Sequence, residues 1–260
     1  MIRMNGFRWI YLVIGILCLY ACKQAPKAEQ QSIEMPAGAT PVPVQISDMN
    51  CFAERGQFFV TGVCNNTTNQ WQRIWLRMEP SKRDGKAVYV QGERGVVFPV
   101  FSTAIPPQGR SAFFQGWDGK LFSGVPDTCN VVCAGAVSVE AGPILLVEQK
   151  SMVRMVTPAV TGKEPQEIGR QFSAVVSNPL DKPSQHPCVE VLLYGNDKRL
   201  WFVSTLDLTQ EQPSLHQDGQ GDIAPGTKRR FSTEITYNNL PAMLVAGKIG
   251  AMDALAFEKR

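Results

Sequence analysis

One strand pattern occurs twice in the chain, and this repeat limits the folds that the chain can adopt. Residues 59–65 resemble residues 172–178, and each segment is followed by a polar loop and then an apolar strand. Later, residues 105–109 correspond to residues 223–226. The intervals from the asparagine that ends the first motif to the isoleucine that begins the second are 40 and 45 positions. We therefore expect one supersecondary plan to be used twice.

Short segments with alternating apolar and polar side chains indicate strands. Residues 73–78, 189–193 and 231–236 each alternate in this way, as a strand with one buried face does. Long helical patterns are scarce. The expected fold class is all-β, with two tandem immunoglobulin-like β-sandwich domains after a lipidated tether.

The expected domain boundaries follow from where the strand patterns stop. The first β-sandwich is predicted over residues 45–157 and the second over residues 166–260. Between them, residues 158–165 contain Pro, Gly and charged residues that interrupt the strand pattern, which favours a linker.

The chain begins with a basic head and an apolar run that stops at a cysteine. The run over residues 9–21 is shorter than the roughly 20 residues that a membrane-spanning helix needs. Residues 1–21 are therefore predicted to be a signal peptide. The ending LYAC, residues 19–22, resembles the bacterial lipobox, which implies that Cys22 carries palmitate and other acyl chains at the mature N-terminus. The alternative is an ordinary secretory signal that ends near a cysteine.

Residues 22–44 are expected to form the lipid anchor and a flexible tether. They are rich in Pro, Ala, Gln and charge and show no apolar periodicity. Lys23 stands where an aspartate would resemble an inner-membrane retention signal. The expected location is the outer membrane, held by the lipid anchor and facing the periplasm.

The charge balance argues against a nucleic-acid-binding protein. The sequence has 26 basic and 23 acidic residues, and removal of Arg3 and Arg8 with the signal leaves 24 basic residues. A nucleic-acid binder is expected to show a basic excess on one face. We therefore expect protein partners and no nucleic acid.

Five cysteines lie beyond the predicted anchor, namely Cys51, Cys64, Cys129, Cys133 and Cys188. On an extended strand Cys129 and Cys133 would lie about 13 Å apart, too far to bridge each other. Each is expected to form a disulfide with Cys51 or Cys64, and the sequence does not decide which. Cys188 is left over. The cysteine spacing does not fit a zinc site, because there is no CxxC pair and no nearby histidine pair.

The sequence offers little catalytic chemistry. His186 and His216 are the two histidines, and both lie in polar loops without an orienting partner nearby in the sequence. Residues 216–222 contain acids and glycines but not the spacing of a calcium loop. No common hydrolase, nucleotide-binding or zinc-protease motif occurs. We therefore predict no enzyme, no metal and no cofactor.

Two tryptophans are candidates for contact with a partner. Trp117 lies among glycines in residues 115–124, and Trp75 lies between two arginines on the outward face of its strand. Aromatic side chains in such positions can anchor a ligand, or they can close the end of a sandwich. The same two residues would serve an alternative function, the binding of glycan or cell wall.

Residues 172–249 resemble the outer-membrane lipoprotein of type VI secretion systems, the TssJ family. The matching features are an Asn-Pro at 178–179, a polar loop, an apolar strand over residues 189–194, and an Ala-Pro-Gly at 224–226. The resemblance implies a transthyretin-like β-sandwich whose loop after the first strand contacts the periplasmic domain of an inner-membrane secretion component. The loop residues are Leu180, Asp181, Lys182, Pro183, Ser184, Gln185, His186 and Pro187.

The expected function is that of a lipid-anchored periplasmic protein-binding component of an envelope-spanning secretion assembly. The alternative is a free-standing β-sandwich module in the envelope that binds glycan or cell wall.

Overall fold

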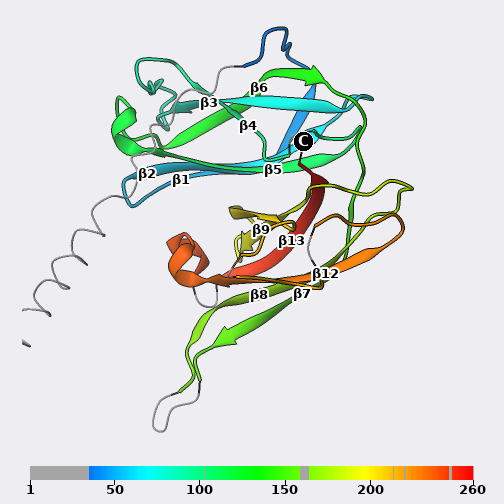
Figure 1. Ribbon diagram of the computed structural model, residues 1–260. Helices are drawn as coiled ribbons and strands as arrows, with labels where there is room; N and C mark the ends of the chain where they lie inside the picture. Colours follow the sequence, from blue (N-terminus) through cyan, green and yellow to red (C-terminus); the bar gives the residue numbers. More distant parts are fainter. Residues whose placement is uncertain are drawn as a thin grey trace, which may run out of the picture. The chain divides into compact units, whose positions relative to one another are not determined.

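The computed structural model has an all-β fold, as predicted, built from strands and three short 3-10 turns (Figure 1). It describes residues 35–102, 104–158, 164–212, 214–219, 221–245 and 248–259. These residues belong to one compact unit. The predicted signal peptide and Cys22 lie outside the described residues.

The first β-sandwich has two three-stranded antiparallel sheets, in the orders β1-β2-β5 and β4-β3-β6. A short 3-10 turn, η1, spans Gly119–Leu121. Between the sheets lies an apolar core of buried side chains that includes Phe58, Ile74, Leu76 and Phe113. The strands are β1 (Val44–Glu54), β2 (Gln57–Asn66), β3 (Gln72–Ser81), β4 (Val96–Pro99), β5 (Arg110–Asp118) and β6 (Thr128–Ser138).

The second β-sandwich has a four-stranded sheet in the order β11-β12-β8-β7 and a three-stranded sheet in the order β10-β9-β13. Its core includes Phe172, Val191, Leu193 and Phe231. The 3-10 turns η2 (Tyr237–Asn239) and η3 (Ala242–Leu244) precede the last strand. The strands are β7 (Leu146–Val156), β8 (Glu167–Ser177), β9 (Pro187–Gly195), β10 (Leu200–Asp207), β11 (Leu215–Gln217), β12 (Lys228–Thr236) and β13 (Ile249–Glu258).

The two sandwiches share one topology, so the repeat detected in the sequence is a repeat of structure. The order β1-β2-β5 corresponds to β7-β8-β12, and β4-β3-β6 corresponds to β10-β9-β13. In each sandwich a buried asparagine lies at the end of the second strand and binds the next loop: Asn66 is the last residue of β2, and Asn178 comes directly after β8. The Nδ2 of Asn66 donates to the carbonyls of Gln70 and Ile105, at 2.8 and 3.0 Å. The Nδ2 of Asn178 donates to those of Lys182 and Ile223, at 2.7 and 2.9 Å.

These contacts correct the alignment of the repeat by one residue. The sequence comparison paired Asn65 with Asn178, but Asn66 makes the equivalent hydrogen bonds. Asn65 instead donates to the carbonyl of Gln45 at 2.8 Å. The error arose because two asparagines are adjacent, and only one of them faces the loop.

The predicted boundary between the domains is also corrected. Strand β7 was assigned to the first sandwich, yet it pairs along its length with β8 of the second. Strands β7 and β8 are therefore consecutive antiparallel strands of one sheet, and the expected linker falls between them and not between the sandwiches. Residues 159–163 of that segment lie outside the described part of the chain. Pro, Gly and charge are typical of hairpin turns as well as of linkers, so their presence did not distinguish the two. The sandwiches are connected by residues 139–145, between β6 and β7.

The end of the predicted tether is part of the fold. Thr40 and Ala136 of β6 exchange two backbone hydrogen bonds, of 3.1 and 2.8 Å. Gly135, next to Ala136, lies under Met35 and Ala39, because a Cβ placed on Gly135 would be 3.1 Å from each of them. The described residues before β1 therefore cover part of the β4-β3-β6 sheet.

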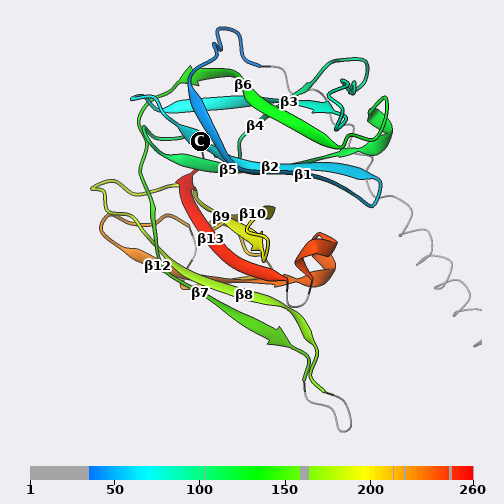
Figure 2. The same ribbon diagram turned by 180° about the vertical axis from the view of Figure 1, so that it is seen from behind.

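The inner sheets of the two sandwiches pack on each other. Val63 and Ala112 of the first sandwich form a third apolar cluster with Leu192, Leu200 and Val203 of the second. Strands β2 and β5 contact β10 across it. Figure 2 shows, from behind, the β1-β2-β5 sheet next to the sheet that contains β9, β10 and β13. The contact buries both faces of β2 and β9, since seven of the ten residues of β2 and eight of the nine residues of β9 are buried.

Replacement of either repeated asparagine by alanine is expected to destabilise the protein. Asn66→Ala and Asn178→Ala each remove at least two hydrogen bonds between the asparagine side chain and separate segments. One such hydrogen bond contributes about 0.5–1.5 kcal/mol to stability. Urea denaturation should show each variant less stable by about 2–3 kcal/mol. The matched control Asn65→Ala should lose less than about 1 kcal/mol. A larger loss for Asn65→Ala than for Asn66→Ala would contradict the corrected alignment.

Candidate partner-binding site

The loop predicted to contact a partner, residues 180–187, joins β8 to β9 at one end of the second sandwich. Six of its side chains are exposed, and Leu180 is an exposed apolar residue at 38%. Ser184 and Pro187 are buried. The exposed residues are Leu180, Asp181, Lys182, Pro183, Gln185 and His186. The loop therefore offers apolar, charged and imidazole groups side by side.

The loop is exposed but held in place at its base. The Asn178 side chain, which donates two hydrogen bonds through Nδ2, also accepts one: its Oδ1 accepts from the backbone N–H of Leu180 at 3.2 Å. Ser184 and Ile223 exchange two backbone hydrogen bonds, both of 3.0 Å. A loop fixed in this way loses little conformational entropy when it binds.

The C-terminal strand supports the second half of the loop. The backbone N–H of Gln185 donates to Oε2 of Glu258 at 3.1 Å. The backbone N–H of Lys259 donates to the carbonyl of His186 at 2.9 Å. The end of β8, the segment that precedes β12 and the end of β13 therefore all contribute to the shape of the loop.

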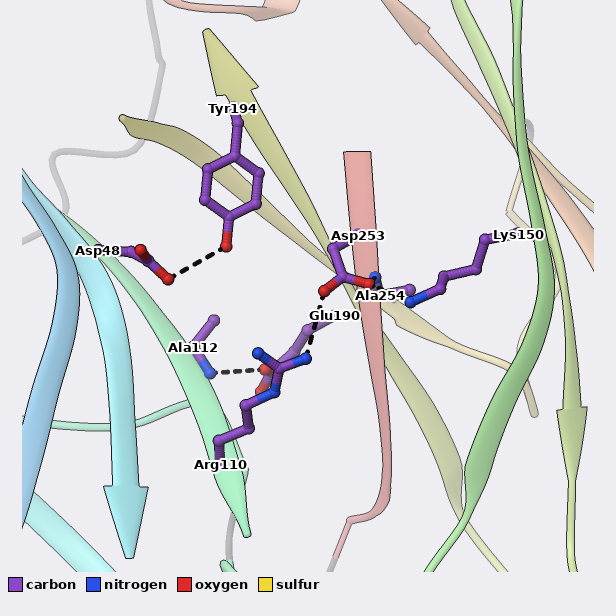
Figure 3. Close-up of polar contacts among 8 residues, drawn as sticks. All are labelled: Asp48, Arg110, Ala112, Lys150, Glu190, Tyr194, Asp253 and Ala254. Carbon is purple, nitrogen blue, oxygen red and sulfur yellow. Dashed lines mark hydrogen bonds and ion pairs between the residues drawn. The ribbon is translucent and has the colours of Figure 1, made fainter. Parts of the chain in front are cut away.

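Strand β9, which begins where the loop ends, is fixed to the first sandwich by a buried carboxyl group. Glu190 is fully buried, and its two oxygens accept hydrogen bonds from β5, of which Figure 3 draws the one from Ala112. The Ser111 hydroxyl donates to Oε1 at 2.8 Å, and the backbone N–H of Ala112 donates to Oε2 at 2.7 Å. Burial raises the pKa of Glu190 to about 8, although the hydrogen bonds from Ala112 and Ser111 act in the opposite direction.

We call the contact of β9 with β5 around Glu190 the junction. Charged side chains surround it. Asp253 of β13 pairs with Arg110 of β5 at 3.3 Å and with Lys150 of β7 (Figure 3). Burial alone would raise the pKa of Asp253, but the hydrogen bond from Lys150 and the other favourable contacts outweigh it and lower the pKa. The Tyr194 hydroxyl donates to Asp48 at 3.4 Å, and burial followed by the charge of Asp48 raises the pKa of Tyr194 to about 12.

Neutral hydrogen bonds add to the junction at the start of β10. The Thr61 hydroxyl and the Asn50 side-chain amide both donate to the carbonyl of Leu200, at 2.6 and 3.2 Å. Both donors come from the first sandwich, and both are buried. Polar and apolar contacts together therefore fix β9 and β10 against β2 and β5.

The sequence did not point to Glu190 as a structural residue. A signal was present, because Glu190 is the one acidic residue within the otherwise apolar stretch of β9. A carboxyl group inside a buried strand needs hydrogen-bond partners. Those partners lie on β5, which is far away in the sequence.

Both candidate tryptophans are buried, which contradicts their assignment as contact residues. Trp75 is 7% exposed and pairs with Pro99 and Gly135 on the neighbouring strands. Its face was predicted to point outward, but the residues before β1 lie over that face at Gly135. Trp117 is 4% exposed and packs edge-to-face on Phe98, with ring centroids 5.7 Å apart. It belongs to β5 and not to a loop, so alternation directs its ring into the core.

The remaining predicted groups are placed as follows. The structure draws no disulfide bond at Cys51, Cys64, Cys129, Cys133 or Cys188. His216 Nε2 lies 4.0 Å from Glu234, and its side chain is exposed. Among the residues that the structure describes, no three His, Cys, Asp or Glu side chains cluster as metal ligands would. In the same residues we find no helix with the length and apolar character needed to cross a membrane.

No family model and no curated protein matches this chain. Among solved structures it is similar to a red sea bream transglutaminase, with 14% sequence identity and a TM-score of 0.21. The match covers 85% of this chain and 27% of the transglutaminase chain, so this chain spans about a quarter of that protein's length.

We withdraw our prediction from sequence that the chain is not an enzyme, because this likeness neither supports nor refutes an enzymatic activity. A likeness at this TM-score assigns no activity to the chain.

The junction is expected to make stability depend on pH. The folded pKa of Glu190 lies above its ordinary value of 4.5, so the unfolded state loses the proton first as pH rises. The contribution of Glu190 to the free energy of unfolding is fully present below pH 4.5. It falls by about 1.4 kcal/mol per pH unit as pH rises from there to about 8. Glu190→Gln keeps the shape and does not titrate. Urea denaturation at about pH 5 and about pH 8.5 should therefore show wild type losing stability relative to the variant.

Glu148→Gln supplies the control of opposite sign. The hydrogen bond from Lys228 lowers the pKa of Glu148, so its contribution is present at neutral pH and is lost in acid. Equal pH profiles for wild type and Glu190→Gln would refute the assigned role of Glu190.

Proposed function

We propose that this protein is a lipid-anchored periplasmic component of an envelope-spanning secretion assembly, and that it works by binding another protein. Loop 180–187 captures the periplasmic domain of an inner-membrane component. Acyl chains on Cys22 hold the other end at the outer membrane. This proposal extends the resemblance of residues 172–249 to the type VI secretion lipoproteins.

The observation that carries the proposal is the combination of exposure and rigidity in the loop. Six side chains point to solvent, while Asn178, Ser184 and the end of β13 hold the backbone. Interfaces gain affinity when the binding loop is ordered before contact, because less entropy is lost on binding. The corresponding turn of the first sandwich offers less, because two of its side chains form hydrogen bonds within the protein. Thr67 donates to the carbonyl of Pro43, and Thr68 donates to Oδ1 of Asn66.

The glycan-binding alternative is less well supported. It depended on Trp75 and Trp117, and both rings are buried in the first sandwich. Glycan recognition through aromatic stacking requires an accessible ring face, which these two residues lack without unfolding of the sandwich.

The loop can be tested with a surface variant that leaves its base intact. Leu180→Asp/Lys182→Glu/His186→Ala keeps Asn178, Ser184 and Pro187. We expect at least a tenfold loss in recovery of the inner-membrane component when the protein is purified from its native envelope in mild detergent, because a few interface residues dominate binding energy. The melting temperature should stay within about 2 °C of wild type.

Thr67→Ala/Asn69→Ala, in the corresponding turn of the first sandwich, is the matched control and should recover the component as wild type does. Undiminished recovery by the folded loop variant would refute the proposed contact. Equal loss in both variants would point to a general change in the protein.

The anchor is tested by Cys22→Ser. Cells fed labelled palmitate should incorporate it into wild type and not into the variant, and the variant should move from the membrane to the soluble fraction. Incorporation of label into Cys22→Ser would place the acyl chain on another residue.

A further inference from the structure

We propose that two disulfides close the first sandwich, Cys51–Cys129 and Cys64–Cys133, and that Cys188 stays a thiol. Each bridge joins the β1-β2-β5 sheet to the β4-β3-β6 sheet across the core. The sequence left open which cysteines pair, and the arrangement of the strands favours one of the connectivities.

The first pair lies where β1 meets β6. Cys51 Sγ is 4.0 Å from Oγ1 of Thr128, the residue next to Cys129. Strands β1 and β6 are in contact although they belong to opposite sheets. The Cys129 thiol also hydrogen-bonds to Cys51, which lowers the pKa of Cys51 below its ordinary value.

The second pair follows from the strand registers. Cys51 lies opposite Val60 on β2, and Cys64 is four residues further along that strand on the same face. On the other sheet, Cys133 is four residues beyond Cys129, again on one face. Both steps correspond to about 13 Å. If Cys51 faces Cys129, Cys64 faces Cys133. Burial raises the pKa of Cys64 to about 12, and the neighbouring Cys133 acts in the same direction.

The same spacing disfavours the other connectivities. Cys129 with Cys133, and Cys51 with Cys64, are each displaced by about 13 Å along the strands. The crossed pairs, Cys51 with Cys133 and Cys64 with Cys129, carry the same displacement in addition to the gap between sheets. A disulfide requires Cα atoms within about 7 Å.

The oxidation is a two-step exchange with a small-molecule or protein disulfide. The Cys51 thiolate attacks one sulfur of that disulfide and forms a mixed disulfide, while the other sulfur leaves as a thiolate and takes up a proton. The Cys129 thiol loses its proton and attacks the Cys51 sulfur, which forms the bridge and releases the second thiol. Two cysteine thiols are oxidised, and one external disulfide is reduced to two thiols.

Cys188 serves as an internal reference. It is 1% exposed in β9 of the second sandwich, where its partners across the sheet are Asp207 and Phe257. Burial raises the pKa of Cys188 to about 12. The other four described cysteines all belong to the first sandwich, so Cys188 is expected to react with alkylating reagents only after unfolding.

The test is a disulfide map of the full chain isolated from its native cells. Free thiols are blocked with N-ethylmaleimide under denaturing conditions, and the protein is digested without reductant. Trypsin separates Cys51 from Cys64 at Arg55, and a second protease must cut at Val131 or Val132 to separate Cys129 from Cys133. Mass spectrometry should identify the linked pairs Cys51–Cys129 and Cys64–Cys133 and maleimide on Cys188.

Any other linkage among these cysteines would overturn the proposal. So would maleimide on all five after equilibration with excess oxidised glutathione. As an independent measurement, a reductant should lower the melting temperature of the oxidised protein by roughly 10 °C. Cys188→Ser should show the same shift, whereas Cys51→Ser/Cys129→Ser should show a smaller one. No shift in wild type would contradict a structural role for the bridges.

Discussion

The packing of the two inner sheets on each other is the contact on which the arrangement of this protein depends. Strands β2 and β9 are buried on both faces, so each serves two cores at once. Glu190 fixes the position of β9 relative to β5 in this packing. An apolar face tolerates sliding, but a buried carboxyl group requires its donors on β5 to stay within hydrogen-bond distance. The junction thereby fixes β9, and β9 fixes one end of the exposed loop.

The repeat explains how one plan yields two different surfaces. Both sandwiches keep the buried asparagine after the second strand, because it supplies donors that the carbonyls of two separate segments need. What differs is the turn that the asparagine holds. In the first sandwich the Thr67 and Thr68 side chains of the turn form hydrogen bonds within the protein. In the second sandwich most of the loop side chains face solvent. Because the asparagine binds the backbone of the turn, the side chains of the turn can differ between the two sandwiches.

The all-β class and the doubled plan were predictable, because both depend on local alternation and on motif order. The exposed loop at 180–187 was located by resemblance. The burial of Trp75 and Trp117 was not predictable, because it depends on which segment covers a strand face and on where β5 ends. The assignment of β7 failed for a similar reason: a hairpin turn and a linker have the same composition. Glu190 was missed because its partners are about eighty positions away, and periodicity within one strand carries no information about them.

The backbone bridge between Thr40 and Ala136 has a consequence for mechanical load. In the proposed anchored form, tension from the membrane reaches the folded part at its N-terminal end. It first meets two hydrogen bonds at Thr40 and then β1, an edge strand that pairs only with β2 within its sheet. Because β1 and β2 form an antiparallel hairpin, a pull at Val44 opens their ladder pair by pair from Asn66 instead of shearing all pairs together. The first sandwich would therefore yield gradually and act as a compliant link between the anchor and the loop.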